Sequence, residues 1–232
     1  DADDVLTLAQ TIRDLPSVQF RGLMTHAGHA YGASSDHELA GIGRAEGEQL
    51  LTLAEHLCEQ GVSVATISVG STPTARHVVA VTGITELRVG NYIFNDMMQV
   101  ALGSAEIDQC ALTVLATVIS MPTNDRAVID AGSKALGLDR GAHGKENIRG
   151  FGTVVGRDMV ISRLSEEHGV IELPGHGLAL GERVRIIPNH ACPVVNLYDR
   201  AYLVDGEAVV ESLPISARRR SIEPPAQRST SR

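Results

Sequence analysis

The chain has 232 residues, of which 43% are hydrophobic, and its 20 Lys and Arg against 28 Asp and Glu give a formal net charge of -8. This length and apolar content suffice for one large domain or two modest ones with real cores. No basic stripe is interleaved with aromatic residues, so nucleic acid is not a predicted partner. The cysteines are few and widely spread (Cys58, Cys110, Cys192), which argues against a disulfide framework and for a reducing, cytoplasmic setting. We find neither an apolar run of membrane-spanning length nor a signal peptide, and predict no membrane partner.

The first half of the chain alternates strand-like and helix-like segments. In chain order, the pattern predicts a helix over 4–14, a strand over 18–24, a helix over 36–60, a strand over 62–69, a short helix over 75–81 and a strand over 85–89. The long helix is indicated by apolar residues at helical spacing, from Leu39 to Leu57. Strand, loop and helix repeated with short connections indicate a parallel β/α architecture.

The second half changes to closely spaced strands. They are expected over 111–121, 127–130, 153–155, 159–164, 170–173 and 184–187, followed by a hairpin over 201–213. Gly, Pro and Asp-Gly turns separate them, which favours a mainly antiparallel β domain. We therefore predict a partial β/α barrel over 1–104, a β domain over 105–221 and a disordered tail over 222–232.

Polar side chains follow each predicted parallel strand, where functional groups of such folds collect. The first strand leads to His26, His29 and Tyr31. The second leads into the turn 68–74, whose small residues, Ser71 and Thr72 among them, expose backbone N–H groups and hydroxyls before a helix. The third leads to the segment 88–92. Two Gly/Ser/Asn turns without a Walker lysine favour a small phosphorylated cofactor over plain turns or a nucleoside triphosphate.

A histidine and a cysteine stand two residues apart between two prolines, Pro188 and Pro193, which stiffen the turn that carries them. The imidazole of His190 and the thiolate of Cys192 suit a borderline-soft divalent cation such as zinc. A buried thiol beside a turn histidine is the alternative for the isolated pair. Lys134, which follows Asp130, has the amine of a Schiff-base residue, but a surface lysine is the preferred interpretation.

Taken together, these motifs resemble a known family of enzymes. The segment 22–26 and the Arg88-Val89-Gly90 strand end resemble the alanine-racemase type of pyridoxal-phosphate (PLP) enzyme. The ordered set of 28–32, 68–74, 89–92, 130–134, 165–169 and 188–192 resembles the metal-dependent D-serine dehydratase and D-threonine aldolase branch. The match runs in order to about Ser221.

The resemblance implies a TIM-like β/α barrel that binds PLP, followed by a β domain with a divalent metal site. It assigns the PLP phosphate to Ser71, Thr72, Gly90 and Asn91, with Tyr92 beside it, and the pyridine nitrogen to Arg88. It assigns the metal, Zn²⁺ or else Mn²⁺ or another divalent cation, to His190 and Cys192. A second acid/base role falls to His26 or His29, with Tyr31 as a further catalytic candidate.

The resemblance also places the cofactor lysine upstream of Asp1. The chain is therefore expected to be the C-terminal part of an enzyme and inactive alone. The implied reaction is β-elimination of the hydroxyl of D-serine to give pyruvate and ammonia. The alternatives are a D-threonine aldolase, giving glycine and an aldehyde, and a non-catalytic fragment. The turn 70–73 and Cys192 favour the dehydratase, because aldolases of this branch carry a Gly-rich turn and an Asp instead. A small D-amino acid substrate and a homodimer are the implied partners.

Overall fold

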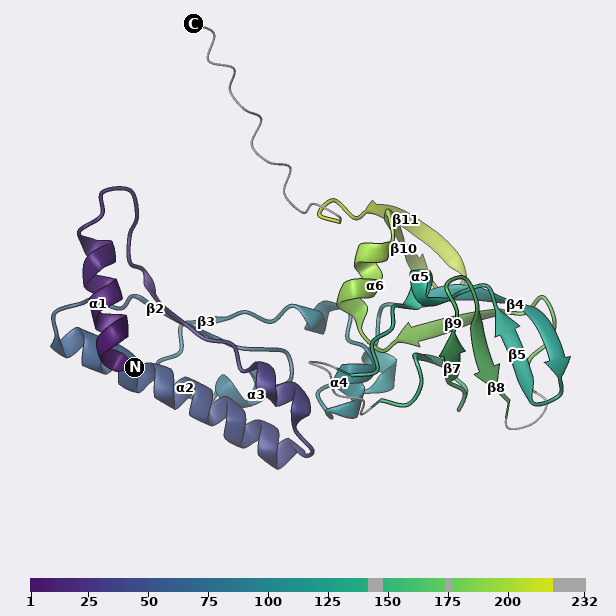
Figure 1. Ribbon diagram of the computed structural model, residues 1–232, viewed down its shortest axis with the longest axis horizontal. Helices are drawn as coiled ribbons and strands as arrows, with labels where there is room; N and C mark the ends of the chain where they lie inside the picture. Colours follow the sequence, from purple (N-terminus) through teal and green to yellow (C-terminus); the bar gives the residue numbers. More distant parts are fainter. Residues whose placement is uncertain (142–147, 174–176, 219–232) are drawn as a thin grey trace, which may run out of the picture. The chain divides into compact units, whose positions relative to one another are not determined.

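The computed structural model describes residues 1–141, 148–173 and 177–218 (Figure 1). They form two compact units: unit 1 comprises Asp1–Thr113 and Asp139–Gly150, and unit 2 comprises Val114–Leu138 and the chain from Phe151 onward. The expectation from the sequence places the boundary near residue 105, whereas the compact units divide after Thr113. The predicted tail over 222–232 lies outside the described residues.

Unit 1 is built on three short parallel strands in the order β1 (Gly22–Met24), β2 (Thr66–Val69) and β3 (Glu86–Leu87). Its α-helices are α1 (Ala2–Arg13), α2 (Asp36–Glu59), α3 (Ala75–Val78) and α4 (Met97–Ala101), with 3₁₀ turns η1 (Gly28–Gly32), η2 (Asn91–Ile93) and η3 (Ile107–Gln109). The parallel register pairs Leu23 with Ile67 and Val69 with Leu87, so the carboxyl ends of the strands lie along one edge. This arrangement confirms the predicted parallel β/α class.

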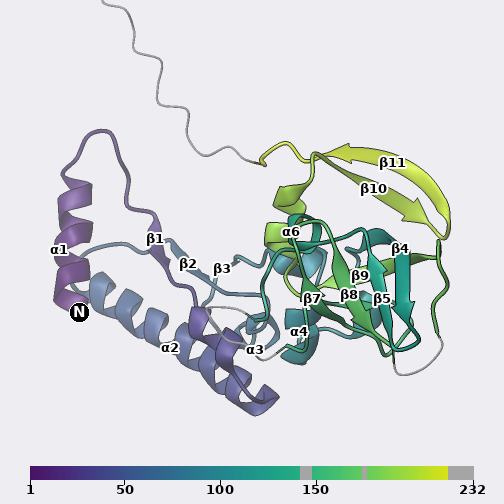
Figure 2. The same cartoon turned by 45° about the vertical axis from the view of Figure 1, so that its right-hand side comes forward.

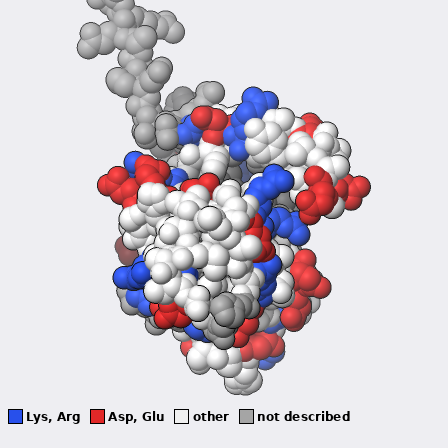
Figure 3. All heavy atoms as spheres, turned by 90° about the vertical axis from the view of Figure 1, so that its right-hand side faces the viewer, with Lys and Arg blue, Asp and Glu red and all other residues white. Residues whose placement is uncertain are grey.

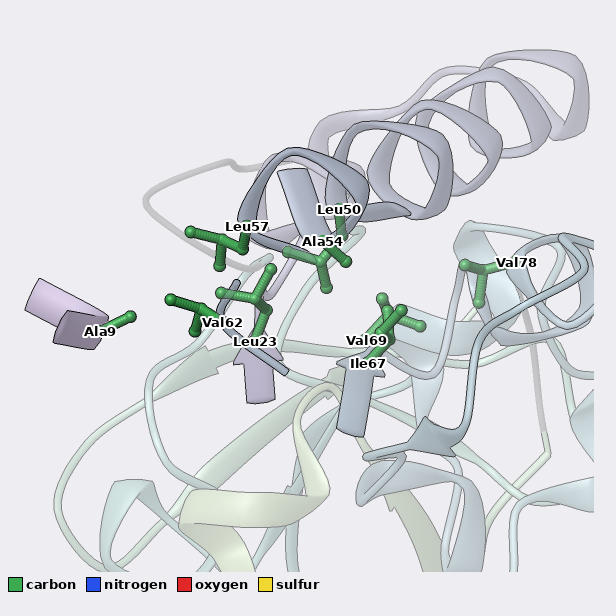
Figure 4. Close-up of a cluster of buried hydrophobic side chains, with 9 residues drawn as sticks. All are labelled: Ala9, Leu23, Leu50, Ala54, Leu57, Val62, Ile67, Val69 and Val78. Carbon is green, nitrogen blue, oxygen red and sulfur yellow. The ribbon is translucent and has the colours of Figure 1, made fainter. Parts of the chain in front are cut away.

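The core of unit 1 lies between one face of this sheet and α2 (Figure 4). Leu57 of α2 and Val69 of β2 are both fully buried there. Helix α2 begins where predicted because Ser35 caps it, accepting a hydrogen bond from the Glu38 backbone N–H at 3.2 Å. The helix therefore gives unit 1 a rigid support behind the strands.

Unit 2 is an antiparallel sheet of six strands with a separate hairpin (Figure 2). The sheet order is β6-β9-β4-β5-β8-β7, and the hairpin pairs β10 with β11. The bounds are β4 (Val114–Thr123), β5 (Arg126–Ile129), β6 (Gly152–Val154), β7 (Ile161–Leu164), β8 (Gly169–Glu172), β9 (Arg183–Pro188), β10 (Arg200–Asp205) and β11 (Ala208–Pro214). Two helices accompany them, α5 (Ser133–Leu136) and α6 (Ala191–Leu197). The predicted antiparallel β domain is confirmed.

The surface charge and the helices were compared with the features expected of nucleic-acid-binding and membrane-spanning proteins. On the face of the molecule drawn in Figure 3, basic and acidic side chains are interspersed around uncharged surface. Within the described residues, no helix combines the length and apolar character needed to cross a bilayer.

Candidate active site

The carboxyl edge of the unit 1 sheet continues beyond the strands as a set of hydrogen-bonded loops. The backbone N–H of Thr25 donates to the carbonyl of Ser68 at 3.1 Å, and that of Arg88 donates to the carbonyl of Val69 at 2.9 Å. These bonds to β2 extend the pairing past the carboxyl ends of β1 and β3. Three sequence-predicted segments, those beginning at His26, Gly70 and Arg88, are thereby brought to one edge.

His26 is exposed, but its ring is fixed. Its Nδ1 lies 2.8 Å from the carbonyl oxygen of Gly70. A carbonyl oxygen only accepts hydrogen bonds, so the proton of this bond belongs to Nδ1. The neutral imidazole then carries its lone pair on Nε2, which makes Nε2 the atom able to accept a proton.

Arg88 spans all three strands of the edge. One of its terminal nitrogens donates to the hydroxyl of Ser68 and the other to the carbonyl of Thr25. The Ser68 hydroxyl in turn donates to the carboxylate of Glu86, its register partner on β3. The guanidinium is therefore oriented by two neighbours and keeps further N–H donors for a ligand.

The turn after β2 offers small polar groups for an anion. The Ser71 and Thr74 hydroxyls lie 3.0 Å apart, and both residues are buried. The shielded Oγ1 of Thr72 has no hydrogen-bond partner among the described residues. An unpaired buried hydroxyl is costly, so a ligand oxygen at this position would stabilise the turn. Because α3 is only four residues long, any anion at this turn would be bound by backbone N–H groups and hydroxyls rather than by a helix dipole.

The segment after β3 completes this part of the edge. Gly90 has open space where a side chain would begin, which leaves its backbone approachable. Asn91 is buried, and its amide nitrogen donates to Asp96 at 2.6 Å, whereas Tyr92 is exposed. The orphaned Thr72 hydroxyl, the open Gly90 and the oriented Arg88 together fit a phosphorylated pyridine cofactor.

The other two catalytic candidates in the loop after β1, His29 and Tyr31, have different environments. His29 is exposed on the 3₁₀ turn η1. Tyr31, half-buried, packs against two small apolar clusters that include Leu39 and Met98. Tyr31 therefore contributes to the packing of its loop, while His26 is the candidate that the hydrogen bonds tie to the edge.

Two polar residues of unit 1 have roles that the sequence analysis missed. Glu46, on α2, is buried, and its Oε1 accepts from the backbone N–H groups of Ala27 at 3.1 Å and Gly70 at 3.3 Å. Asp96, fully buried, accepts from Asn91 and caps α4 by accepting from the backbone N–H of Gln99. A charged residue on the apolar face of α2, between Leu39 and Leu50, is the signal that would have identified Glu46.

In unit 2, the predicted metal ligands lie at the start of α6. His190, partly buried, is the N-cap residue, and Cys192 is exposed in the first turn. The stiff turn expected from the two prolines is thus a strand-to-helix junction, because Pro193 fits the first turn of a helix. A catalytic zinc takes three protein ligands, and the described residues contain no group of three or more potential ligands. The donor types nevertheless suit zinc.

In unit 2, Lys134 forms ion pairs with two glutamates that follow β7, Glu166 and Glu167. The Lys134 ammonium lies 2.5 Å from Glu167 and 3.4 Å from Glu166, and its side chain is 62% exposed. The hydrogen bond to Glu167 raises the pKa of the Lys134 ammonium above its usual value. A lysine held in its charged form is a poor Schiff-base nucleophile, which agrees with the surface assignment.

Comparison with known proteins defines the class of this chain. The model of the alanine racemase N-terminal domain matches residues 1–97, and that of a putative serine dehydratase domain matches residues 111–204. D-threo-3-hydroxyaspartate dehydratase of Delftia sp. is 35% identical over 209 residues, covering 82% of this chain and 55% of that protein. D-threonine aldolase of Arthrobacter sp. is 33% identical over 221 residues, covering 92% and 55%.

Comparison with solved structures finds the same enzyme. The Delftia dehydratase superposes with a TM-score of 0.83 at 31% identity, covering 92% of this chain and 60% of that chain. Further structures of that enzyme are a cysteine-to-alanine mutant in the metal-free form and a histidine-to-alanine mutant.

Fold and site therefore define an alanine-racemase-like protein of fold type III. More narrowly, the chain belongs to the D-serine dehydratase and D-threonine aldolase family, as its motifs indicate. It spans about half the length of the curated relatives that it matches.

Proposed function

We propose that the protein is a PLP- and zinc-dependent D-serine dehydratase-like lyase, which converts D-serine to pyruvate and ammonia. The observation that carries the proposal is the meeting of His26, the Ser71–Thr72 turn and Arg88 at one sheet edge. Family membership supports the reaction class, because the relatives are named as lyases of D-β-hydroxy amino acids. The substrate is then a small molecule, and we propose a homodimer as the working form.

Each residue of the edge has a separate task in this proposal. Ser71, Thr72, Gly90 and Asn91 would hold the phosphate of PLP, with Tyr92 beside it, and Arg88 would face the pyridine nitrogen. Bound PLP supplies the electron-withdrawing system that makes the substrate α-carbon acidic. His26 accepts or returns a proton at Nε2, because Nδ1–H is committed to Gly70. His29 and Tyr31 remain candidates for the same proton transfer.

His190 and Cys192 would hold the divalent cation. A zinc ion supplies Lewis acidity toward the substrate hydroxyl, the leaving group of the elimination. Support comes from the metal-free cysteine mutant and the histidine mutant of the Delftia dehydratase, whose substituted positions stand two residues apart, as His190 and Cys192 do. The remaining ligands are then contributed from outside this pair.

A D-threonine aldolase is the second candidate, favoured by the similarity to the Arthrobacter enzyme. Both reactions require the same α-carbon chemistry and differ in the bond that breaks. The turn 70–73, which lacks the Gly-rich sequence of the aldolases, and Cys192 in place of an Asp favour elimination over retro-aldol cleavage. A non-catalytic, PLP-binding homologue is the third.

The test uses the full-length protein, loaded with PLP, stripped of metal and then given zinc or manganese. It is incubated separately with D-serine, D-threonine and D-threo-3-hydroxyaspartate, and the products are identified by mass spectrometry. Pyruvate from D-serine, or oxaloacetate from the hydroxyaspartate, restored by zinc, is the expected result. Glycine and acetaldehyde from D-threonine would replace the dehydratase with the aldolase. Turnover of none of the three would favour a binding role.

A further inference from the structure

Glu46 is a carboxylate in an unusual position. It lies on the long helix α2, on the face that packs toward the strands, and only 8% of its surface is exposed. Its neighbours on that face, Gly43 and Leu50, are also buried. Burying an ionisable side chain is costly unless its oxygens are hydrogen-bonded, so a specific contact must hold this one in place.

The contact joins two loops that are far apart in the sequence. One oxygen, Oε1, accepts from the N–H of Ala27, in the loop after β1, and from the N–H of Gly70, at the end of β2. Both bonds are buried, and the second oxygen, Oε2, is shielded with no partner. Glu46 therefore uses a single oxygen to fix the separation of the two strand ends.

Both residues that Glu46 holds are connected to His26, one through the chain and one through a hydrogen bond. Ala27 is its next residue in the chain, so one bond from Glu46 fixes the backbone immediately after the histidine. Gly70 offers its N–H to Glu46 and its carbonyl to His26 Nδ1. The orientation of the imidazole is therefore determined on both sides by one carboxylate oxygen that does not touch the ring.

We propose that Glu46 is the positioning residue for His26, selecting its Nδ1–H tautomer and directing Nε2 to the reacting substrate. The proposal rests on the proposed function for what His26 does, but the tautomer is a property of the chain that needs no turnover. Without Glu46, the Gly70 N–H has no acceptor to hold the backbone at Gly70, and we expect the carbonyl of the same residue to move away from His26 Nδ1. A misplacement of about 1 Å lowers turnover about 100-fold.

The first test reads the tautomer directly. Nitrogen NMR of the imidazoles is recorded on the full-length protein and its E46L, E46Q and E48L variants, with H26Q used to assign the signal. Glu48 lies two residues along the same helix and is exposed, so E48L is the matched control. We expect the Nδ1-protonated pattern in the wild type, in E48L and in E46Q, which keeps a carbonyl acceptor. In E46L we expect mixed tautomers, and an unchanged signal there would overturn the proposal.

E46D provides a second variant if E46L does not fold. Its carboxylate is one methylene shorter and cannot reach both N–H groups, so we expect a partial loss of the Nδ1–H signal. A full wild-type signal in E46D would equally contradict the proposal.

The second test uses turnover and separates positioning from general support. E46L should lower kcat about 100-fold with KM and the cofactor absorbance unchanged, whereas E46Q should restore most of the rate. In an H26Q background, E46L should cause no further loss, because both changes act on one group. Additive losses would assign Glu46 a role independent of His26. If the wild type turns over none of the substrates, the proposed function fails and the NMR result still decides this inference.

Discussion

At the residue scale, the backbone of Gly70 is as important to the edge as any side chain. Its φ of 119° lies in a region that other residues rarely adopt, and this conformation aims its N–H at Glu46 and its carbonyl at His26. A Cβ at Gly70 would lie 3.5 Å from the backbone nitrogen of Arg88, which is an ordinary van der Waals distance. The energetic cost of a substitution therefore comes from the backbone conformation and not from a steric clash.

We therefore expect Gly70→Ala to lower the free energy of unfolding by about 1–3 kcal/mol. Gly41→Ala is the matched control, since Gly41 lies exposed inside α2 with open space around it. That change should raise stability by about 0.5–1 kcal/mol, because alanine favours a helix. Urea unfolding of both variants measures the two effects. If Gly70→Ala and Gly41→Ala had equal free energies of unfolding, alanine would not be strained at the φ of Gly70.

The thiol of Cys110 provides a prediction about pH. Partial burial, with Asp96 and Asp108 nearby, raises the pKa of Cys110 from 9.0 to about 11. The thiolate is the reactive form, so alkylation of Cys110 by iodoacetamide should be slow at pH 8 and accelerate about tenfold for each pH unit toward 11. Peptide mass spectrometry follows this rate, with the exposed Cys58 as the reference that reacts readily at pH 8. A Cys110 that reacts as fast as Cys58 at pH 8 would contradict the raised pKa.

At the element scale, the apolar face of α2 packs against the sheet of unit 1 and contributes much of its core. Leu57 is fully buried against the sheet, whereas Leu8 on α1 is 59% exposed. Leu57→Ala should cost about 2–5 kcal/mol of unfolding free energy, because it removes buried methyl groups and leaves a cavity. Leu8→Ala makes the same chemical change at the surface and should cost less than about 0.5 kcal/mol. Thermal unfolding of the two variants distinguishes them, and similar losses would mean that α2 is not the core helix.

The sequence predicted the extent of helix α2 better than that of strand β1, and it did not predict α4. Helix α2, expected over 36–60, is observed over Asp36–Glu59 because its spacing and its Ser35 cap are local signals. Strand β1 was expected over 18–24 but begins at Gly22, since its parallel pairing with β2 begins at Thr66. The extent of a strand depends on its neighbour, and a single segment of sequence does not contain that information.

Site residues divide in the same way. His26, Ser71 and Arg88 follow strands, so their meeting at one edge was predictable from the parallel architecture. Glu46 lies in a helix and reaches two loops only in the folded state. Its polarity on an apolar face was visible in the sequence, but its partners were not.

At the scale of the whole molecule, the proposed function assigns different groups to the two units. Unit 1 carries the groups proposed for PLP, and unit 2 carries His190 and Cys192 at the start of α6. Because two ligands are too few for a catalytic zinc, a zinc site at this pair would have to be completed by other groups. The chain spans about half the length of its curated relatives.

The zinc content of cysteine variants tests whether Cys192 of unit 2 is a metal ligand. Full-length wild type, C192S and C58S are dialysed against zinc and then buffer, and the bound metal is measured by mass spectrometry. Serine is a much weaker zinc ligand than a thiolate, so C192S should lose most of its zinc, about 10-fold or more in affinity. C58S makes the same change at another exposed thiol and should retain it. Equal zinc in both variants would exclude Cys192 as a metal ligand and leave the turn 70–73 as the remaining reason for preferring the dehydratase over the aldolase.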